Sequence, residues 1–230
     1  VLDVFHRHNS NGRIVSMKNI QNIRTDYVKG VLRIQDLQDS PGQQLSKWLQ
    51  DAITAEALDA NAFCLSTVNS EGFPRGRNVL VKGVEEEAIV FYTNKSSSKS
   101  ADISLNPQAG ATFFWPELER QVCIYGHVSA LNEEENDGYF ASRPRESQLG
   151  AWVSKQSQPL ASREELDATL EAVREKYRDI EVVDRPSHWG GFRIAFVSVE
   201  FWQGRASRLH DRIIYTKGEG GQWQKGLLQP

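Results

Sequence analysis

Residues 88–131 read AIVFYTNKSSSKSADISLNPQAGATFFWPELERQVCIYGHVSAL, and the architecture expected for the whole chain starts from this stretch. Three apolar runs, rich in β-branched and aromatic residues, predict strands over residues 88–93, 109–115 and 121–131. The serines at 96–98 predict the start of a short helix, which Asn106 and Pro107 end. The short connections favour an antiparallel sheet or barrel.

Apolar runs on both sides of this stretch extend the sheet. A run over residues 62–68 ends in the turn signal NSEG, and a further strand is expected over residues 78–82. The last fifty residues predict strands over 192–202 and 212–215 and a weak one around Trp223. About eight strands, with helices gathered between the fifth and the sixth, predict a mainly β fold, a β-barrel with helical decoration.

The first long helix is expected to begin at Ser40. Ser40 can cap it, Pro41 suits its first position, and Gln43 completes a capping box. The apolar residues that follow recur with helical spacing and predict one buried stripe, made of Leu45, Trp48, Leu49, Ala52 and Ile53.

Two further capping patterns predict helices later in the chain. Asn132 with Glu135 begins a helix that must end near Arg143, because Pro144 follows. Ser162 begins another with Glu165. Its expected apolar face consists of Leu166, Leu170, Val173 and Tyr177.

Length and composition suit a single globular domain in a chain of 230 residues, 39% of them hydrophobic and 25% charged. We expect that domain to cover residues 23–230, with residues 1–22 as a disordered tail or extension and Met17, the only methionine, as the natural start. The net charge of −3 argues against a general nucleic-acid binder. No apolar run approaches the roughly 18 residues of a membrane span, and the amino terminus carries no secretory signal, so we expect a cytoplasmic protein.

The two cysteines, Cys64 and Cys123, lie in apolar, strand-like segments. Without CxxC spacing or a nearby histidine, they are predicted to be buried and reduced rather than a disulfide or a metal site. We therefore expect no metal.

Two clusters of cations and hydroxyls follow predicted strands. Arg77 and Lys82 bracket one strand, where both can reach an anion or serve as ordinary edge charges. In residues 91–99, FYTNKSSSK, hydroxyls and Lys99 open a helix, an arrangement that favours a phosphate or simply caps the helix.

Two further clusters combine cations with aromatic residues. Tyr139 and Arg143 share one helical face, with Ser147 after the proline break, a donor set that suits a phosphate monoester or a surface helix end. In residues 200–212, Arg208 and His210 are predicted to alternate onto one strand face over a planar ligand, unless the segment is only a structural hairpin. The cations together indicate two anionic groups, and no hydrolase, zincin or Rossmann motif stands out.

Six motifs carry a resemblance to a known family. They are RxxxxK at 77–82, FYTN at 91–94, ERQV at 119–122, YFxSRPRxSQxGAWVSKQS at 139–157, WGGFR at 189–193 and EFWQGxxxRLHDR at 200–212. The chain resembles the pyridoxine (pyridoxamine) 5'-phosphate oxidase family from about Ile23 to Pro230. The resemblance implies an FMN-binding split β-barrel that forms a homodimer with two flavin sites at the subunit interface. It implies oxidation of pyridoxine or pyridoxamine 5'-phosphate by O2 to pyridoxal 5'-phosphate, with release of H2O2 and, from the amine, ammonia.

The resemblance also implies roles for individual residues. FMN contacts would fall to Arg77, Lys82, Tyr92, Thr93, Lys99, Gln121, Gln156, Ser157, Trp202 and Arg212, with Ser98 where the family usually has arginine. The substrate phosphate would be held by Lys82, Tyr139, Arg143 and Ser147. Arg208 and His210 are the catalytic candidates beside the pyridine ring, and Arg24 and Tyr27 would form a lid over the substrate. The alternatives are a related flavin oxidase for a planar substrate such as a phenazine precursor, a carrier without turnover, and a purely structural barrel.

Overall fold

The computed structural model describes residues 25–230, so the expectations for residues 1–22, Met17 and Arg24 lie outside the described residues. Its strands are β1 Ala62–Val68, β2 Pro74–Val84, β3 Ala88–Asn94, β4 Gln108–Trp115, β5 Arg120–Ala130, β6 Trp189–Gln203, β7 Asp211–Lys217 and β8 Trp223–Leu227. Its α-helices are α1 Pro41–Thr54, α2 Ser98–Leu105, α3 Glu133–Ala141, α4 Arg145–Val153 and α5 Arg163–Lys176. Short 3-10 turns cover Ile34–Asp36, Pro116–Leu118 and Ala206–Arg208.

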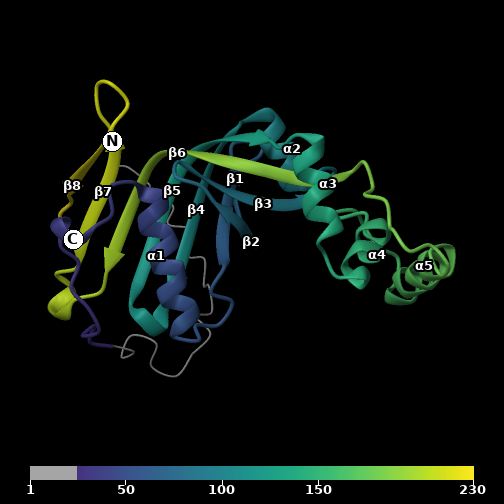
Figure 1. Ribbon diagram of the computed structural model, residues 1–230, viewed down its shortest axis with the longest axis horizontal. Helices are drawn as coiled ribbons and strands as arrows, with labels where there is room; N and C mark the ends of the chain where they lie inside the picture. The colour runs from purple at the N-terminus through teal and green to yellow at the C-terminus, as the bar shows by residue number, and fades with distance from the viewer. Residues whose placement is uncertain (1–24) are drawn as a thin grey trace, which may run out of the picture.

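The strands form one antiparallel sheet that closes on itself. Its order is β3-β2-β1-β4-β5-β6-β7-β8, and an additional pairing of β3 with β6 closes the first six strands into a barrel (Figure 1). β7 and β8 continue the sheet beyond β6. The expected mainly β architecture with a barrel and helices is therefore confirmed.

The long strand β6 belongs to both parts of the sheet. Residues 189–195 pair with β3, and residues 198–203 pair with β7. Its register with β5 shifts between Tyr125 and Gly126, where Gly126 lies so close to the backbone of Ala195 that a Cβ would sit 2.3 Å from its carbonyl oxygen. Only glycine fits such an approach. The shift lets β6 leave the barrel and continue beside β7. We call the part of the sheet formed by the second half of β6 with β5, β7 and β8 the outer sheet.

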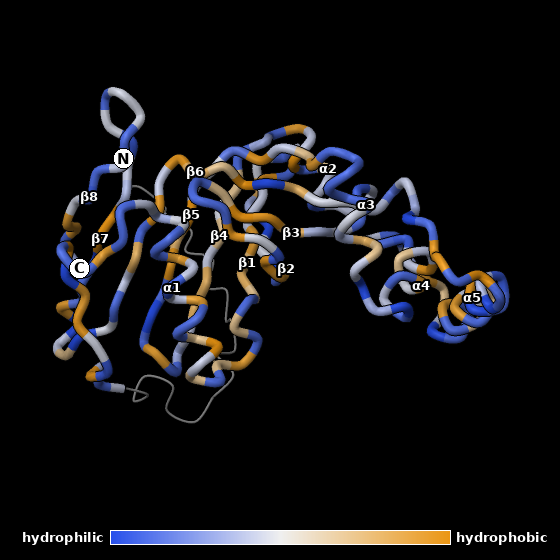
Figure 2. Tube along the Cα trace, viewed as in Figure 1, coloured by the Kyte–Doolittle hydropathy of each residue, from blue (hydrophilic) through white to orange (hydrophobic). Residues whose placement is uncertain are grey.

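The barrel interior is filled by alternate side chains of its strands, with Phe63, Phe91, Phe113 and Phe201 among the largest buried groups. Figure 2 shows hydrophobic stretches along the barrel strands and hydrophilic ones in the connections. Helix α1 adds the buried Leu45, Trp48, Leu49 and Ala52, and the ring of Trp48 packs edge-on against Phe201 at 5.0 Å. The expectation for Ile53 was wrong, because its side chain is 56% exposed at the edge of the stripe.

A second, smaller core joins the helices that follow the barrel. Phe140, Leu149, Tyr177 and Trp189 are among its buried members, and Figure 1 shows α4 and α5 at the end of the molecule farthest from β8. The caps expected for α1, α3 and α5 are present: Ser40, Asn132 and Ser162 accept hydrogen bonds from the backbone three residues on.

Two elements differ from the expectation. β2 begins at Pro74 rather than at residue 78. Residues 74–80 are in a strand because they pair with β1, whereas pairing with β3 begins only at Val81. Helix α4 was not predicted, although Pro144 before it and an acidic first turn at Glu146 are ordinary signs of a helix start.

The thiols of Cys64 and Cys123 are free, as expected, but they are half-buried rather than buried because both lie on the outer face of the barrel wall. Within residues 25–230 no helix is long and apolar enough to cross a membrane. The same residues contain no group of three or more His, Cys, Asp or Glu side chains placed to hold a metal ion.

Candidate functional site

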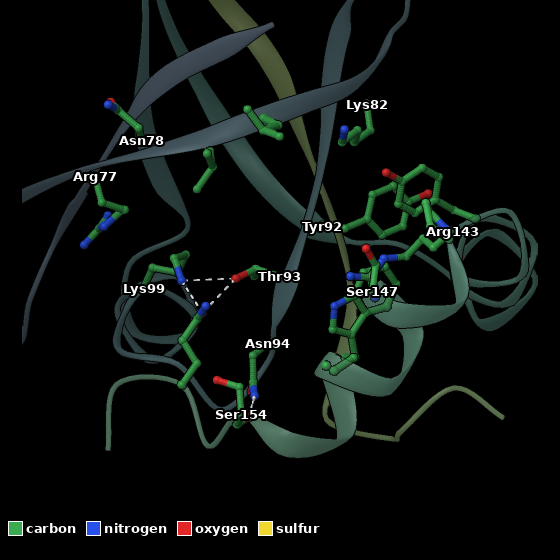
Figure 3. Close-up of a pocket in the computed structure, with 18 of the residues that line it drawn as sticks. Arg77, Asn78, Lys82, Tyr92, Thr93, Asn94, Lys99, Arg143, Ser147 and Ser154 are labelled. Atoms are coloured by element: carbon green, nitrogen blue, oxygen red, sulfur yellow. Dashed lines mark hydrogen bonds between the residues drawn. The ribbon is translucent and has the colours of Figure 1, made fainter. Parts of the chain in front are cut away.

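A cavity of about 770 Å³ lies between the barrel strands β2 and β3 and the helices α3 and α4 (Figure 3). Nine of the residues expected to bind cofactor or substrate line it: Arg77, Lys82, Tyr92, Thr93, Lys99, Tyr139, Arg143, Ser147 and Gln156. Residues from β2, β3, α2, α3 and α4 therefore meet in one place.

Strand β2 supplies one wall of the cavity from both of its faces. Pairing with β3 starts only at Val81, so within residues 25–230 no strand pairs with residues 74–80 on that side. Arg77 and Lys82 have opposite parity along the strand, yet both line the cavity. The register between β2 and β3 shifts between Val81 and Gly83, so the regular alternation of side chains is interrupted at Lys82, which can then face the same space as Arg77.

Arg77 is held by a buried carboxylate. Its guanidinium donates to the hydroxyl of Thr67 at 2.7 Å and to the carbonyl of Leu65 at 3.2 Å. Asp102 of α2 lies 3.7 Å from Arg77, accepts a hydrogen bond from Thr67, and also pairs with Arg75. Burial lowers the pKa of Arg77, which the charge of Asp102 partly opposes.

Lys99 lies at the end of β3 where α2 begins. Its ammonium donates to Thr93 Oγ1 and Ser97 Oγ, both at 3.1 Å, and to Gln156 Oε1 at 2.6 Å. All three partners are neutral, and Lys99 is only 8% exposed. Burial, and secondarily the charge of Arg77, lower the pKa of Lys99 to about 8. The site thus holds a cation whose charge no carboxylate among the described residues offsets.

Ser98 and Ser157 meet beside this lysine. The backbone N–H of Ser98 donates to Ser157 Oγ at 3.2 Å, and Ser157 has a left-handed backbone with φ of 71°. Asn94 donates to the carbonyl of Ser154 at 3.0 Å and so ties the end of β3 to the loop after α4. Figure 3 shows Asn94 and Ser154 at the lower end of the cavity.

Aromatic side chains surround Arg143 at the other end. Tyr92 stacks on Tyr139 with ring centroids 3.9 Å apart, and the guanidinium of Arg143 lies 4.4 Å from the ring centroid of Trp189. Burial raises the pKa of Tyr92 and of Tyr139, so both phenols stay protonated donors near neutral pH. Sequence reasoning missed Trp189, whose signal was its place at the start of the WGGFR motif.

A second group of expected residues lies outside this cavity. Tyr27, Trp202 and His210 pack together, with ring centroids 4.6 Å apart for Trp202 and His210 and 5.5 Å apart for Tyr27 and His210. Tyr27 and Arg208 border a separate hollow of about 320 Å³. Gly204 permits this packing, because a Cβ there would lie 2.7 Å from the Tyr27 ring.

The prediction that Arg208 and His210 share a strand face was wrong. Residues 206–208 form a 3-10 turn, and β7 begins only at Asp211. Ser207 and Arg208 have left-handed backbones, with φ of 56° and 61°. His210 is held instead by the N–H of Arg205, which lies 3.1 Å from Nδ1.

The remaining expected residues form a row across the outer sheet. Gln121, Trp202 and Arg212 are direct cross-strand neighbours on β5, β6 and β7. Arg212 makes a bidentate ion pair with Glu200 at 2.8 and 2.9 Å. None of the three lines the large cavity, so within one chain the expected site residues fall into two groups.

Comparison with known proteins supports a common origin along nearly the whole chain. Residues 49–177 match the family described as "Pyridoxamine 5'-phosphate oxidase", and residues 189–230 match the "Pyridoxine 5'-phosphate oxidase C-terminal dimerisation region". The pyridoxine/pyridoxamine 5'-phosphate oxidase of Cytophaga hutchinsonii is 49% identical over 212 residues, which cover 92% of this chain and 99% of that protein. A relative of the same name from Synechocystis sp. is 45% identical, covering 92% of this chain and 98% of that protein.

Solved structures show the same architecture. PhzG from Burkholderia lata, in complex with tetrahydrophenazine-1-carboxylic acid, has a TM-score of 0.80 and 28% identity, covering 87% of this chain and 98% of that chain. An FMN-binding, pyridoxamine 5'-phosphate oxidase-related protein from Nostoc punctiforme has a TM-score of 0.62 at 14% identity, covering 82% of this chain and 95% of that chain, which shows the fold alone. From the family match over residues 49–177 and relatives at 45–49% identity along their full length, we conclude that the chain belongs to the pyridoxamine 5'-phosphate oxidase family.

Proposed function

We propose that the protein is an FMN-dependent oxidase that converts pyridoxine and pyridoxamine 5'-phosphates to pyridoxal 5'-phosphate with O2, producing H2O2 and, from the amine, ammonia. The observation that carries this proposal is the placement of two cations, Lys99 and Arg143, at opposite ends of one cavity, where no carboxylate of residues 25–230 pairs with either (Figure 3). Two such cations suit two phosphate esters, one on a cofactor and one on a substrate.

The end around Lys99 fits the phosphate of FMN. A buried ammonium with only hydroxyl and amide partners has no counter-charge among the described residues, so an anion can supply it, and Arg77 adds a second cation. Thr93, Ser98, Gln156 and Ser157 supply neutral hydrogen-bonding groups there. The volume of the cavity falls within the roughly 300–1,000 Å³ of typical ligand sites. When bound, FMN would supply the acceptor for the hydride taken from the substrate.

The end around Arg143 fits the phosphate of the substrate. The guanidinium presents a planar fork of N–H groups, and the phenol of Tyr139 and the hydroxyl of Ser147 lie along the same wall. Lys82 projects from the opposite wall, as Figure 3 shows. We assign these four side chains to the phosphate monoester.

The second group of residues completes the site, in our proposal, from a second copy of the chain in a homodimer. Trp202, Arg208, His210 and Arg212 all lie within residues 189–230, which match a dimerisation region. The same sheet face carries two exposed aromatic side chains, Phe114 and Tyr125, 54% and 58% exposed, and aromatic residues are enriched where subunits meet. Gln121, Trp202 and Arg212 would then contact FMN bound in the partner, with Tyr27 and Arg24 over the substrate.

His210 and Arg208 would orient the substrate at its reacting end. Because Nδ1 of His210 accepts the N–H of Arg205, the neutral ring carries its proton on Nε2 and can donate it to a substrate oxygen or nitrogen. Arg208 offers a guanidinium that can stabilise negative charge at the same position.

An anaerobic absorbance titration with pyridoxine 5'-phosphate tests the proposal. The FMN-loaded protein is expected to bleach with substrate and to recover its flavin spectrum when air is admitted. Unphosphorylated pyridoxine serves as the control and should bleach the flavin only at far higher concentration. If the protein binds pyridoxine 5'-phosphate but its flavin spectrum never bleaches, the protein is a carrier without turnover.

The alternative of a phenazine-type oxidase is favoured by the likeness to PhzG at 28% identity. Arg143→Ala separates the two substrates. Loss of a charge-assisted hydrogen bond should raise KM for the phosphate ester about 10- to 100-fold. An unchanged KM in this variant, together with turnover of a reduced phenazine carboxylic acid, would replace our substrate assignment.

A further inference from the structure

Trp189 lies at the start of β6, on the wall of the large cavity, and is not among the residues assigned to the cofactor or the substrate. Its side chain is only 7% exposed. Its ring is nearly parallel to those of Tyr92 and Tyr139, with centroids 5.4 and 6.1 Å away and interplanar angles of 9° and 8°. The indole therefore belongs to a stack of three aromatic rings that ends at one of the expected phosphate ligands.

Arg143 contacts the same indole. Its guanidinium carbon lies 4.4 Å from the Trp189 ring centroid and 5.5 Å from that of Phe140, both within the range of cation–π attraction. Nη1 of Arg143 is buried and has no hydrogen-bond partner among residues 25–230. No Asp or Glu of those residues lies within ion-pair distance of it.

Other arginines of the chain are stabilised differently. Arg77 lies beside Asp102, Arg212 pairs with Glu200, and Arg193 pairs with Glu85 and Glu135. A carboxylate would offset the charge of a guanidinium and occupy its N–H groups, whereas an aromatic face attracts the cation without formal charge and leaves those groups free. Arg143 thus keeps both its charge and its donors for an anion.

The backbone of Trp189 is fixed by several bonds. It pairs with Asn94 in the β3–β6 register, and its N–H donates to the carbonyl of Pro186 at 2.9 Å. Arg185 donates to the carbonyl of Trp189 at 2.7 Å, while its guanidinium pairs with Glu133 and Asp137 of α3. The backbone that carries the indole is therefore fixed, in part through the helix that carries Tyr139, and the side chain itself is buried.

We propose that Trp189 is a positioning residue for substrate recognition: it holds the guanidinium of Arg143, and through the ring stack the phenol of Tyr139, in place for a phosphate monoester dianion. This inference rests on the proposed function, since it takes Arg143 as the ligand of the substrate phosphate. It predicts selectivity for phosphorylated over unphosphorylated pyridoxine compounds that depends on an aromatic side chain at position 189.

The test uses the FMN-loaded variants Trp189→Leu, Trp189→Phe, Arg143→Ala and the double variant. Trp189→Leu should raise KM for pyridoxine 5'-phosphate and the Ki of inorganic phosphate about 5- to 30-fold, the range of a desolvated cation–π contact, with kcat nearly unchanged. Trp189→Phe should recover most of the loss. In the Arg143→Ala background, Trp189→Leu should have a clearly smaller further effect, because only the contact through the ring stack to Tyr139 is then left to lose.

Trp152→Leu is the matched control. Trp152 lies on α4 outside the cavity, where its indole donates to the carbonyl of Asp184 and packs against Tyr177. Its loss should lower Tm without changing the Ki of inorganic phosphate. Equal effects of the Trp152 and Trp189 variants on that Ki would overturn the inference.

The variants distinguish a failure of the positioning role of Trp189 from a failure of the proposed substrate site. If Arg143→Ala weakens phosphate binding and Trp189→Leu does not, the positioning role is wrong and the substrate site stands. If the Trp189→Leu effect is equally large with and without Arg143, the indole acts only on the fold and the inference is again wrong. If Arg143→Ala changes neither KM nor Ki, the substrate site itself is misplaced.

Discussion

At the scale of single residues, the cavity is characterised by a buried lysine, Lys99, and a half-buried arginine, Arg143, and no carboxylate within residues 25–230 pairs with either. Lys99 has hydroxyl and amide partners, and Arg143 has aromatic ones. Burying a charge without a counter-charge is unfavourable, so such groups are expected where an anion binds. The serine-rich helix start pointed to Lys99 in the sequence, and the i,i+4 spacing from Tyr139 pointed to Arg143. Whether a carboxylate pairs with either cation depends on residues distant in the chain.

The lowered pKa of Lys99 predicts how FMN binding depends on pH. The ammonium form binds phosphate, so the FMN dissociation constant of the apoprotein should rise about tenfold per pH unit above a pKa of about 8. The phosphate is already a dianion in this range, and Arg77, the nearest other cation, stays charged. Fluorescence titration with FMN between about pH 7 and 10 measures the slope.

Two controls isolate Lys99 in this titration. Riboflavin lacks the phosphate and should bind without the slope, and Lys99→Met should bind FMN weakly at every pH. A dissociation constant for FMN that stays constant through pH 9.5 in the wild-type protein would contradict the assignment of Lys99 to the phosphate.

At the scale of elements, one buried carboxylate of helix α2 bonds to two strands of the barrel. Asp102 accepts from Thr67 of β1 and lies beside Arg75 and Arg77 of β2. The start of α2 was evident from its serines, and the end of β3 from its polar residues. That α2 also supplies the acid which holds Arg77 was not predictable, because the contact joins residues 25 or more positions apart.

Removing this carboxylate should destabilise the barrel–helix junction. Asp102→Ala is expected to lower the free energy of unfolding of the FMN-free protein by about 2 kcal/mol, because Thr67 loses the acceptor of its hydroxyl and the partly buried Arg77 loses its counter-charge. Urea denaturation measures the change. Asp167→Ala on α5, which breaks an exposed i,i+4 pair with Arg163, should cost under about 0.5 kcal/mol. Similar losses in the two variants would show that Asp102 is not a structural anchor.

At the scale of the whole molecule, the expected site residues of one chain lie in two separate groups. One lines the cavity between barrel and helices, and the other lies on the outer sheet of β5, β6 and β7. A homodimer joins them if the outer sheet of one subunit covers the cavity of the other. A single domain over residues 23–230 stays a prediction.

A charge on the outer sheet should separate the proposed dimer. Phe114 lies directly beside Gln121 in the β4–β5 register, so Phe114→Glu places a carboxylate in the proposed interface. Sedimentation velocity should show dimers for the wild-type protein and monomers with weakened FMN binding for the variant. Ile53→Glu, an equally exposed position on α1, should remain dimeric. A monomeric wild-type protein with full FMN affinity would exclude the shared site.

Local patterns in the amino-acid sequence were enough to predict most of the helices and strands and the local chemistry of the site. Strands and caps follow from side-chain alternation and from hydrogen bonds between residues three apart, and the motif at 139–157 named Tyr139, Arg143 and Ser147 through spacing along one segment. These signals are local, so they survive without knowledge of the packing. The same local reasoning failed for Arg208 and His210, where left-handed residues break the expected strand.

Which of these groups meet depends on packing between distant parts of the chain. The closure of β3 on β6, the bond of Lys99 to Gln156 and the contact of Arg143 with Trp189 each join residues more than forty positions apart. Such contacts depend on burial and register, because a side chain's partner is set by the strand or helix packed against it. The residue types of the site could therefore be predicted from the sequence, but the charge balance around them and their division into two groups could not.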